Sequence, residues 1–345
     1  MERGNAIAPV FYKLLIVVAT IIWGASFVFM KDAVGVMEPA WLIGVRFTLT
    51  ALILTAVLWR HVRRALTKRD LALGAVLGAA NFLAFWVQTI GLAYTTPGKN
   101  AFLTAVYCVI VPFVYWAVAA RRPNRYNLLA AAMGVAGIGC VSLGAESLSM
   151  GFGDAMSLLC ALFFALHIVL VGRFASGHDV LALTVYQFWM GGLCGLAVGA
   201  VSEPWPDLAA ITPDFLANLA YLVVLASCVA LVIQNVALAH VPPTQASLLL
   251  SLESVFGVVF SVLLYGEALT PRLLLGFALI FGAILVSELL PRPPRAKPAA
   301  PSALPDAEGD AVADLLQGDA MAAGELEERL ASAPDVPRPP VRSEP

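Results

Sequence analysis

The chain has 345 residues, of which 60% are hydrophobic and 13% are charged, and its formal net charge is −2. A soluble domain has about 45–50% apolar and about 25% charged residues, so this composition excludes an ordinary globular cytosolic protein and predicts a membrane protein. The sequence has no basic face with interleaved aromatic residues, which excludes nucleic acid as a partner.

Ten apolar runs are each long enough to form a helix across a hydrocarbon core about 30 Å thick. Turn and breaker residues such as Pro39, Pro97-Gly98 and Pro271 separate them. The first run has no small-residue cleavage site after it, so it is predicted to be retained rather than removed as a signal peptide. The predicted spans are residues 12–30, 40–59, 71–93, 99–119, 127–144, 154–173, 180–201, 215–239, 244–265 and 272–290. The predicted fold class is therefore all-α, a polytopic membrane protein with ten transmembrane helices.

The distribution of Lys and Arg predicts the orientation. With the N-terminus inside the cell, fourteen of these residues lie in the N-terminal arm, the inner loops and the start of the tail, whereas Lys31, Lys99 and Arg272 lie outside. Inner loops of membrane proteins carry the excess of positive charge. The sequence thus predicts a multi-pass protein of the cytoplasmic membrane, with a cytoplasmic N-terminal arm (residues 1–10) and a cytoplasmic C-terminus.

The composition changes after Leu290. Residues 291–345 contain 11 of the 22 prolines and 10 acidic residues, which predicts a disordered cytoplasmic tail. A short helix between Ala311 and Ala331 is the alternative, although Gly318 and Gly324 interrupt it.

The two halves of the membrane region resemble each other. A shift of 146 residues places Gln88 on Gln234 and Tyr107 on Glu253, and a shift of 141 places Trp23-Gly-Ala-Ser-Phe27 on Phe164-Ala-Leu-His-Ile168. A unit of five spans is odd, so two consecutive units cross the membrane in opposite senses. This predicts two inverted five-helix repeats, residues 11–145 and 146–290, of the kind that supports alternating access. The alternative is a duplicated bundle that is merely stable.

One carboxylate lies in the middle of an apolar run, Glu253 within residues 247–260. It is ten to twelve residues from either end of its predicted span, a depth of ~15–18 Å at 1.5 Å per residue. A charge at that depth costs at least ~2.5–3.5 kcal/mol, so the side chain must face a partner or a hydrated cavity, or carry a proton. Glu253 is predicted to be a substrate or proton site; an interhelical hydrogen bond is the alternative.

Other intramembrane polar and aromatic residues are candidates for the same site. Arg46 lies only six residues inside its span, so it either extends to the interface or pairs with a carboxylate or an anionic substrate group. Intramembrane amides also commonly join helices, and this alternative is favoured for any single one of Gln88, Gln234, Asn81, Gln187 and Asn235. The aromatic candidates for stacking on an organic substrate are Trp23, Trp86, Tyr107 and Trp116; helix packing is the alternative for all four, and an interfacial anchor is a further one for Trp116. The candidate residues for substrate or proton binding are Glu253, Arg46, Trp23, Tyr107, Gln88, Gln234 and His167.

Several short motifs in this order and spacing resemble the EamA family of the drug/metabolite transporter superfamily. They are Trp23-Gly-Ala-Ser-Phe27, Arg46-Phe47, residues 88–101, Leu252-Glu253 with residues 265–270, and residues 276–286. The resemblance covers residues 11–290 and implies ten spans in two domains and transport of a small organic molecule, most often outward. Arg121 stands where the family often has a second Glu equivalent to Glu267, so the first half is expected to lack that loop contact.

Motifs of enzymes and of ATP hydrolysis, such as HExxH, GxSxG and GKS/GKT, do not occur in the sequence. We therefore expect no enzyme activity and no cofactor, and transport driven by a gradient. The prediction is a secondary active exporter of a small organic solute, with protons as a candidate coupling ion and the lipid bilayer as its environment. Amino acids, nucleobases, sugars and drugs all remain candidate solutes, and the oligomeric state is open. A facilitative carrier or uptake permease with the same cavity is one alternative, and a non-transporting scaffold acting through its tail is another.

Overall fold

The computed structural model describes residues 4–64, 66–119, 123–142, 150–174, 177–240 and 249–290. The predicted tail and Arg121 lie outside these residues. The helices of the first half are α1 (Gly4–Val34), α2 (Pro39–Val57), α3 (Trp59–Arg64), α4 (Lys68–Ala93), α5 (Pro97–Ala105), α6 (Tyr107–Ala119) and α7 (Arg125–Ser142). Those of the second half are α8 (Phe152–Phe174), α9 (Val180–Ser202), the 3₁₀ turn η1 (Leu208–Ala210), α10 (Pro213–Ala220), the π-helix η2 (Tyr221–Val229), α11 (Ala230–His240), α13 (Leu252–Phe260), the π-helix η3 (Ser261–Tyr265) and α14 (Pro271–Leu289).

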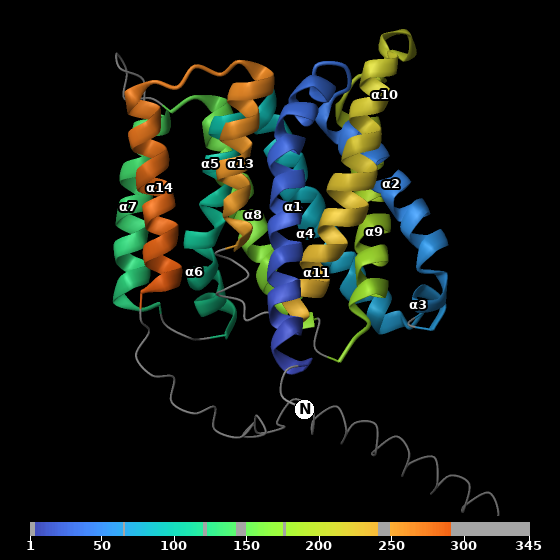
Figure 1. Cartoon of the computed structure of the whole chain (residues 1–345). Helices are drawn as coiled ribbons and strands as arrows, with labels where there is room; N and C mark the ends of the chain where they lie inside the picture. Colours follow the sequence, from blue (N-terminus) through green and yellow to red (C-terminus); the bar gives the residue numbers. More distant parts are fainter. Residues whose placement is uncertain are drawn as a thin grey trace, which may run out of the picture. The chain divides into compact units, whose positions relative to one another are not determined.

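The length and composition of these helices are those of a multi-pass membrane protein. Within the described ranges, seven helical segments are long and apolar enough to cross a membrane. Three shorter apolar helices, 125–141, 252–265 and 271–286, lie at the other predicted spans. Most of these helices stand side by side in Figure 1.

Proline sets the first residue of four helices, because its fixed φ suits the first helical turn and its missing N–H has no partner there. These prolines are Pro39, Pro97, Pro213 and Pro271. A threonine precedes three of them, and its hydroxyl accepts a hydrogen bond from the N–H of the third helical residue. These caps are Thr96, Thr212 and Thr270.

Three of the predicted spans are not continuous α-helices. Val106 separates α5 from α6, and Ser251 precedes α13; both residues have a helical φ and a ψ of −18°, and hydrogen bonds of the 3₁₀ type surround them. The span that contains α10 and α11 has the π-helix η2 between them. The sequence analysis predicted the positions of the spans 99–119, 215–239 and 244–265 but not these irregular turns, which are common at functional sites.

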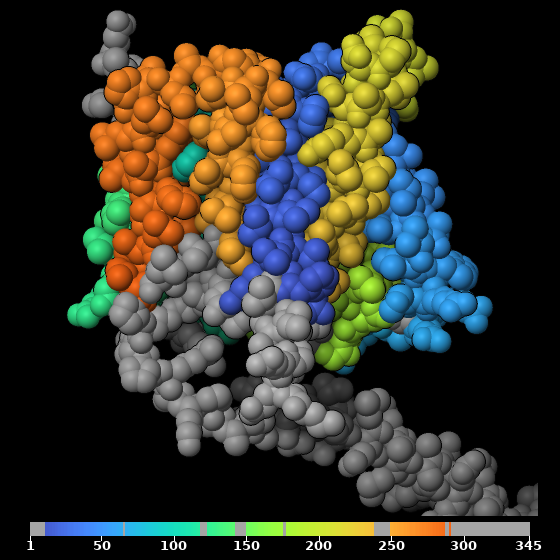
Figure 2. All heavy atoms as spheres, in the orientation of Figure 1, coloured from blue at the N-terminus to red at the C-terminus, as the bar shows by residue number. Residues whose placement is uncertain are grey.

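Small residues allow the helices to approach closely. A Cβ added to Gly195 in α9 would lie 2.5 Å from the Cα of Gly44 in α2, so the two backbones touch at this point. In Figure 2 the side chains of α1, in blue, lie between those of α13 and those of α10 and α11. Helix α1 also packs on α4, and α1, α4, α11 and α13 all contribute to the wall of the cavity described next.

Candidate functional site

One cavity of about 630 Å³, a volume that includes space at its mouth, lies among α1, α2, α4, α5, α6, α8, α11 and α13. All seven candidate residues line it: Trp23, Arg46, Gln88, Tyr107, His167, Gln234 and Glu253. Ten further residues complete the wall: Ser26, Phe27, Met30, Asn81, Phe85, Leu92, Thr104, Phe164, Ile168 and Leu231. The wall is therefore mostly apolar and aromatic, with a few polar groups that converge on one space, as in small-molecule sites.

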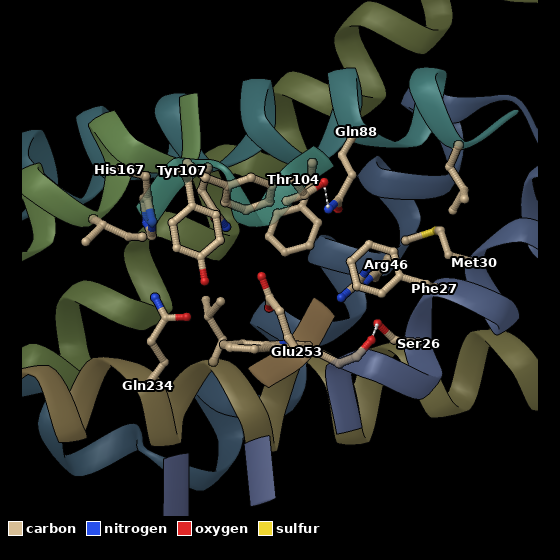
Figure 3. A pocket seen from close by; sticks show the side chains of 17 residues that line it. Ser26, Phe27, Met30, Arg46, Gln88, Thr104, Tyr107, His167, Gln234 and Glu253 are labelled. Carbon is tan, nitrogen blue, oxygen red and sulfur yellow. Dashed lines mark hydrogen bonds between the residues drawn. The ribbon is translucent and has the colours of Figure 1, made fainter. Parts of the chain in front are cut away.

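Glu253 lies in the first turn of α13, directly after the irregular turn at Ser251. Its side chain is 8% exposed and faces the cavity. Figure 3 shows the Tyr107 hydroxyl and the Glu253 carboxyl directed toward one another, and their side chains are close enough to interact. The two residues that the repeat alignment pairs thus face each other across the cavity.

Arg46 is 1% exposed, so it does not extend to the interface. Its Nε donates a hydrogen bond to the Ser227 hydroxyl (2.8 Å), and its Cζ lies 5.0 Å from the centre of the Phe85 ring and 5.7 Å from that of Phe47. Ion pairs within the described ranges do not include Arg46, so Arg46 does not pair there with Glu253 or with any other carboxylate. Arg46 is held by a hydroxyl and by aromatic faces.

The π-helix η2 supplies two of the contacts that hold the cavity wall. Its consecutive residues Ala226 and Ser227 accept hydrogen bonds from Trp23 Nε1 (2.8 Å) and from Arg46 Nε. In a π-helix the backbone bonds run from i to i+5, which alters how neighbouring residues project from the helix. No sequence signal pointed to η2.

The polar groups on the wall differ in their partners. Gln88 Nε2 donates to the Thr104 hydroxyl (3.2 Å), and His167 Nε2 lies 3.1 Å from Gln187 Oε1. Outside the cavity wall, Asn235 Nδ2 donates to the Thr184 hydroxyl (2.9 Å). The helix-joining interpretation is therefore confirmed for Gln187 and Asn235.

Asn81 lines the cavity, although helix joining is the favoured alternative for any single intramembrane amide. Asn81 is fully buried, and both of its amide atoms lack a hydrogen-bond partner among the described residues. Asn81 lies on the same face of α4 as Phe85, Gln88 and Leu92, because these residues follow helical spacing. That spacing, counted back from Gln88, was the signal available in the sequence.

The four aromatic candidates divide into residues that line the cavity and residues that do not. Trp23 and Tyr107 line the cavity, whereas Trp86 and Trp116 are not among its lining residues. Trp86 stacks on Phe82 with 5.5 Å between ring centres, and Trp116 is 46% exposed, as expected of an interfacial aromatic residue.

Charged residues hold the turns at one end of the cavity, next to the buried lining residues Met30 and Leu92. Lys31 Nζ donates to the carbonyl oxygens of Leu92 (2.7 Å), Ala93 (3.0 Å) and Thr95 (2.9 Å), at the C-terminus of α4. Cations stabilise helix C-termini, so Lys31 fixes this end of α4 against α1.

Glu267 holds the start of α5 at the same turn. Its carboxylate accepts hydrogen bonds from the Thr96 hydroxyl, the Ser261 hydroxyl and the Gly98 N–H (3.0 Å). The carboxylate thus lies at the positive end of a helix dipole. The contact joins the turn between α13 and α14 to the turn between α4 and α5.

We expect Trp23→Phe to lower the free energy of unfolding by about 1 kcal/mol, because it removes one buried interhelical hydrogen bond. Trp86→Phe is the matched control, since the Trp86 Nε1 has no partner among the described residues. Thermal unfolding of the purified variants in detergent measures the difference. Equal melting temperatures for the two variants would contradict a role of the Trp23–Ala226 bond.

Comparison with known proteins identifies the family. The model of the EamA-like transporter family matches residues 10–143 and again residues 151–289. An uncharacterized transporter of Archaeoglobus fulgidus is 30% identical over 302 residues, which covers 84% of this chain and 90% of the relative. Protein PecM of Dickeya dadantii is 30% identical over 217 residues, 61% of this chain and 71% of the relative.

The fold agrees with that result. One solved crystal structure matches with a TM-score of 0.61 and 17% sequence identity, over 81% of this chain and 96% of the solved chain. At that identity the match supports the fold alone. From the family match, the chain belongs to the EamA family of the drug/metabolite transporter superfamily and is a membrane transporter.

Proposed function

We propose that the protein is a secondary active transporter of the cytoplasmic membrane that exports a small organic molecule by alternating access, with protons as the coupling ion. The observation that carries the proposal is one cavity whose wall comes from both predicted repeats. Residues 11–145 contribute Trp23, Arg46, Gln88 and Tyr107, and residues 146–290 contribute His167, Gln234 and Glu253. A site at the interface of two repeats is the arrangement on which alternating access depends.

The helix contacts support an inverted repeat of five spans. Span 2 packs on its counterpart, span 7 (α2 on α9), and span 5 packs on span 10 (α7 on α14). The contact of span 1 with span 9 (α1 with α13) has its counterpart in that of span 4 with span 6 (α5 and α6 with α8). Contacts that recur when the halves are exchanged are those expected around a pseudo-two-fold axis.

The irregular turns follow the same symmetry. Val106 in span 4 and Ser251 in span 9 lie within one residue of each other in the alignment that pairs Tyr107 with Glu253. Interrupted helices at a repeat interface are typical of binding sites in secondary transporters. We infer that the two turns act as paired hinges beside the cavity. Both chain termini are placed in the cytoplasm in this proposal, and the outward direction of transport is taken from the family resemblance.

The test compares the metabolites in the medium of cells that overexpress or lack the protein, and then reconstitutes it with the solute that differs. We expect liposomes with an imposed pH gradient to accumulate that solute, and a protonophore to abolish accumulation. Counterflow without any response to the gradient would replace the proposal by facilitated diffusion. A scaffold would be favoured instead if neither assay shows flux of any solute and if the effect of the protein on the cells is lost when residues 291–345 are deleted.

A further inference from the structure

Arg46 places a permanent positive charge in the cavity wall. A guanidinium group stays protonated in proteins, whereas a carboxyl group such as that of Glu253 can become neutral by taking up a proton. Arg46 is 1% exposed, and no carboxylate lies within 4 Å of it among the described residues. Its one side-chain hydrogen bond within the described part of the chain uses Nε, so the two terminal nitrogens remain available there as a planar pair of donors.

Within the described part of the chain, Asn81 adds an amide without a partner to the wall of the same cavity. Both amide atoms are buried without a partner among the described residues, although buried polar groups are almost always hydrogen-bonded. Asn81 lies one helical turn before Phe85 on α4, and the Arg46 guanidinium lies 5.0 Å from the centre of the Phe85 ring. Arg46 and Asn81 line the same cavity, so one anionic ligand there would both satisfy the amide and balance the charge of the arginine.

The surroundings of Arg46 are aromatic and apolar. Phe27 and Met30 line the same cavity as Arg46 (Figure 3), and the Arg46 Cζ lies 5.0 Å from the centre of the Phe85 ring. Such walls suit the flat or apolar body of a small molecule, and they exclude the water that would otherwise screen the charge.

We propose that the transported solute is an organic anion, a carboxylate on an apolar or aromatic body. The carboxylate binds the terminal nitrogens of Arg46 and the amide of Asn81, and the body of the molecule packs on Phe27 and Phe85. The inference rests on the proposed function, since it names the substrate class of the same cavity.

Three probes of one size and different charge test the proposal: benzoate, benzamide and benzylammonium. We expect the purified full-length protein in detergent to bind benzoate at least tenfold more tightly than either of the other probes, measured by ligand-dependent thermal stabilisation. Asn81→Leu removes the amide at similar volume and is expected to weaken benzoate binding at least fivefold. Asn235→Leu, an intramembrane Asn that bonds to Thr184 outside the cavity wall, is the matched control and leaves the preference unchanged.

Arg46 variants give the sharpest comparison. Arg46→Gln is expected to abolish the preference for benzoate over benzamide, and Arg46→Lys to keep part of it. If Arg46→Gln does not fold, the preference of the unaltered protein and the Asn81→Leu comparison decide the question. Four outcomes would each overturn the proposal. Two concern the unaltered protein: benzylammonium binds as tightly as benzoate, or the three probes stabilise the protein equally or not at all. The other two concern the variants: the preference for benzoate persists in Arg46→Gln, or Asn81→Leu and Asn235→Leu have equal effects on benzoate binding.

Failure of this inference can be told apart from failure of the proposed function. Flux of a neutral or cationic solute without any benzoate preference leaves the transporter in place and removes the anion site. Benzoate binding that depends on Asn81, together with an absence of flux for every solute tested in liposomes, removes alternating-access transport and leaves the anion site.

Discussion

Replacement of Glu253 by Gln is expected to reduce transport driven by an imposed pH gradient at least tenfold, while exchange of the same solute without a gradient continues. Glutamine has the shape of the protonated carboxyl group but cannot release a proton. Its side chain keeps the size and polarity of the neutral carboxyl group opposite Tyr107 in the cavity wall. The cavity should therefore still bind solute and change conformation, and only the coupling should be lost.

The measurement is uptake into proteoliposomes with and without a pH gradient, together with counterflow between equal pH values. Glu203→Gln is the matched control, because Glu203 is also a carboxylate that accepts hydrogen bonds, from the N–H groups of Ala40 and Trp41, but it does not line the cavity. Coupled uptake should persist in the control. Gradient-driven accumulation that is unchanged in Glu253→Gln removes Glu253 from the coupling mechanism.

The positions of the helices could be predicted from the sequence because a membrane imposes a minimum length of apolar residues. Proline marked the starts of four helices for a local stereochemical reason. The irregular turns could not be predicted, because Val106 and Ser251 have helical φ values that any residue adopts. Their geometry depends on packing against neighbouring helices rather than on residue type. The π-helix η2 likewise has no residue that marks it.

The polar part of the cavity was accessible from the sequence for an energetic reason: polar groups inside a membrane are costly and must face each other or a cavity. That argument does not separate amides that line a cavity from amides that join helices. Asn81 and Asn235 look alike in the sequence, yet Asn235 bonds to Thr184 and Asn81 has no partner among the described residues. Asn81 lies at helical spacing from Gln88, a candidate cavity residue on the same helix, and this spacing would have separated Asn81 from Asn235. The apolar wall residues carry no such signal, because most residues of any span are apolar.

Replacement of Glu267 by Ala is expected to lower the free energy of unfolding by about 2 kcal/mol, because it leaves two partly buried hydroxyls, those of Thr96 and Ser261, without their acceptor. The Gly98 N–H also loses its bond to the carboxylate but keeps a second acceptor, the Ser261 hydroxyl (3.2 Å). Glu267→Gln should cost less, since its oxygen still accepts and both hydroxyl groups can reorient. Thermal unfolding in detergent measures the series.

The same replacement should also change access to the cavity. The Glu267 contact joins turns of the two halves next to Met30 and Leu92, which are 5% and 1% exposed, so its loss should favour the conformation open at that end. A shift of about 1.4 kcal/mol is a tenfold change in population. In a variant free of native cysteines, we therefore expect Met30→Cys to react with an external, membrane-impermeant maleimide at least tenfold faster when Glu267→Ala is present.

Glu203→Ala is the control, because it removes a comparable carboxylate cap from α2. The close contact of Gly44 with Gly195 still holds α2 on α9 in that variant, so the labelling rate should not change. Equal labelling rates in the two backgrounds would show that Glu267 stabilises the fold without closing the cavity, and would locate the gate at another contact.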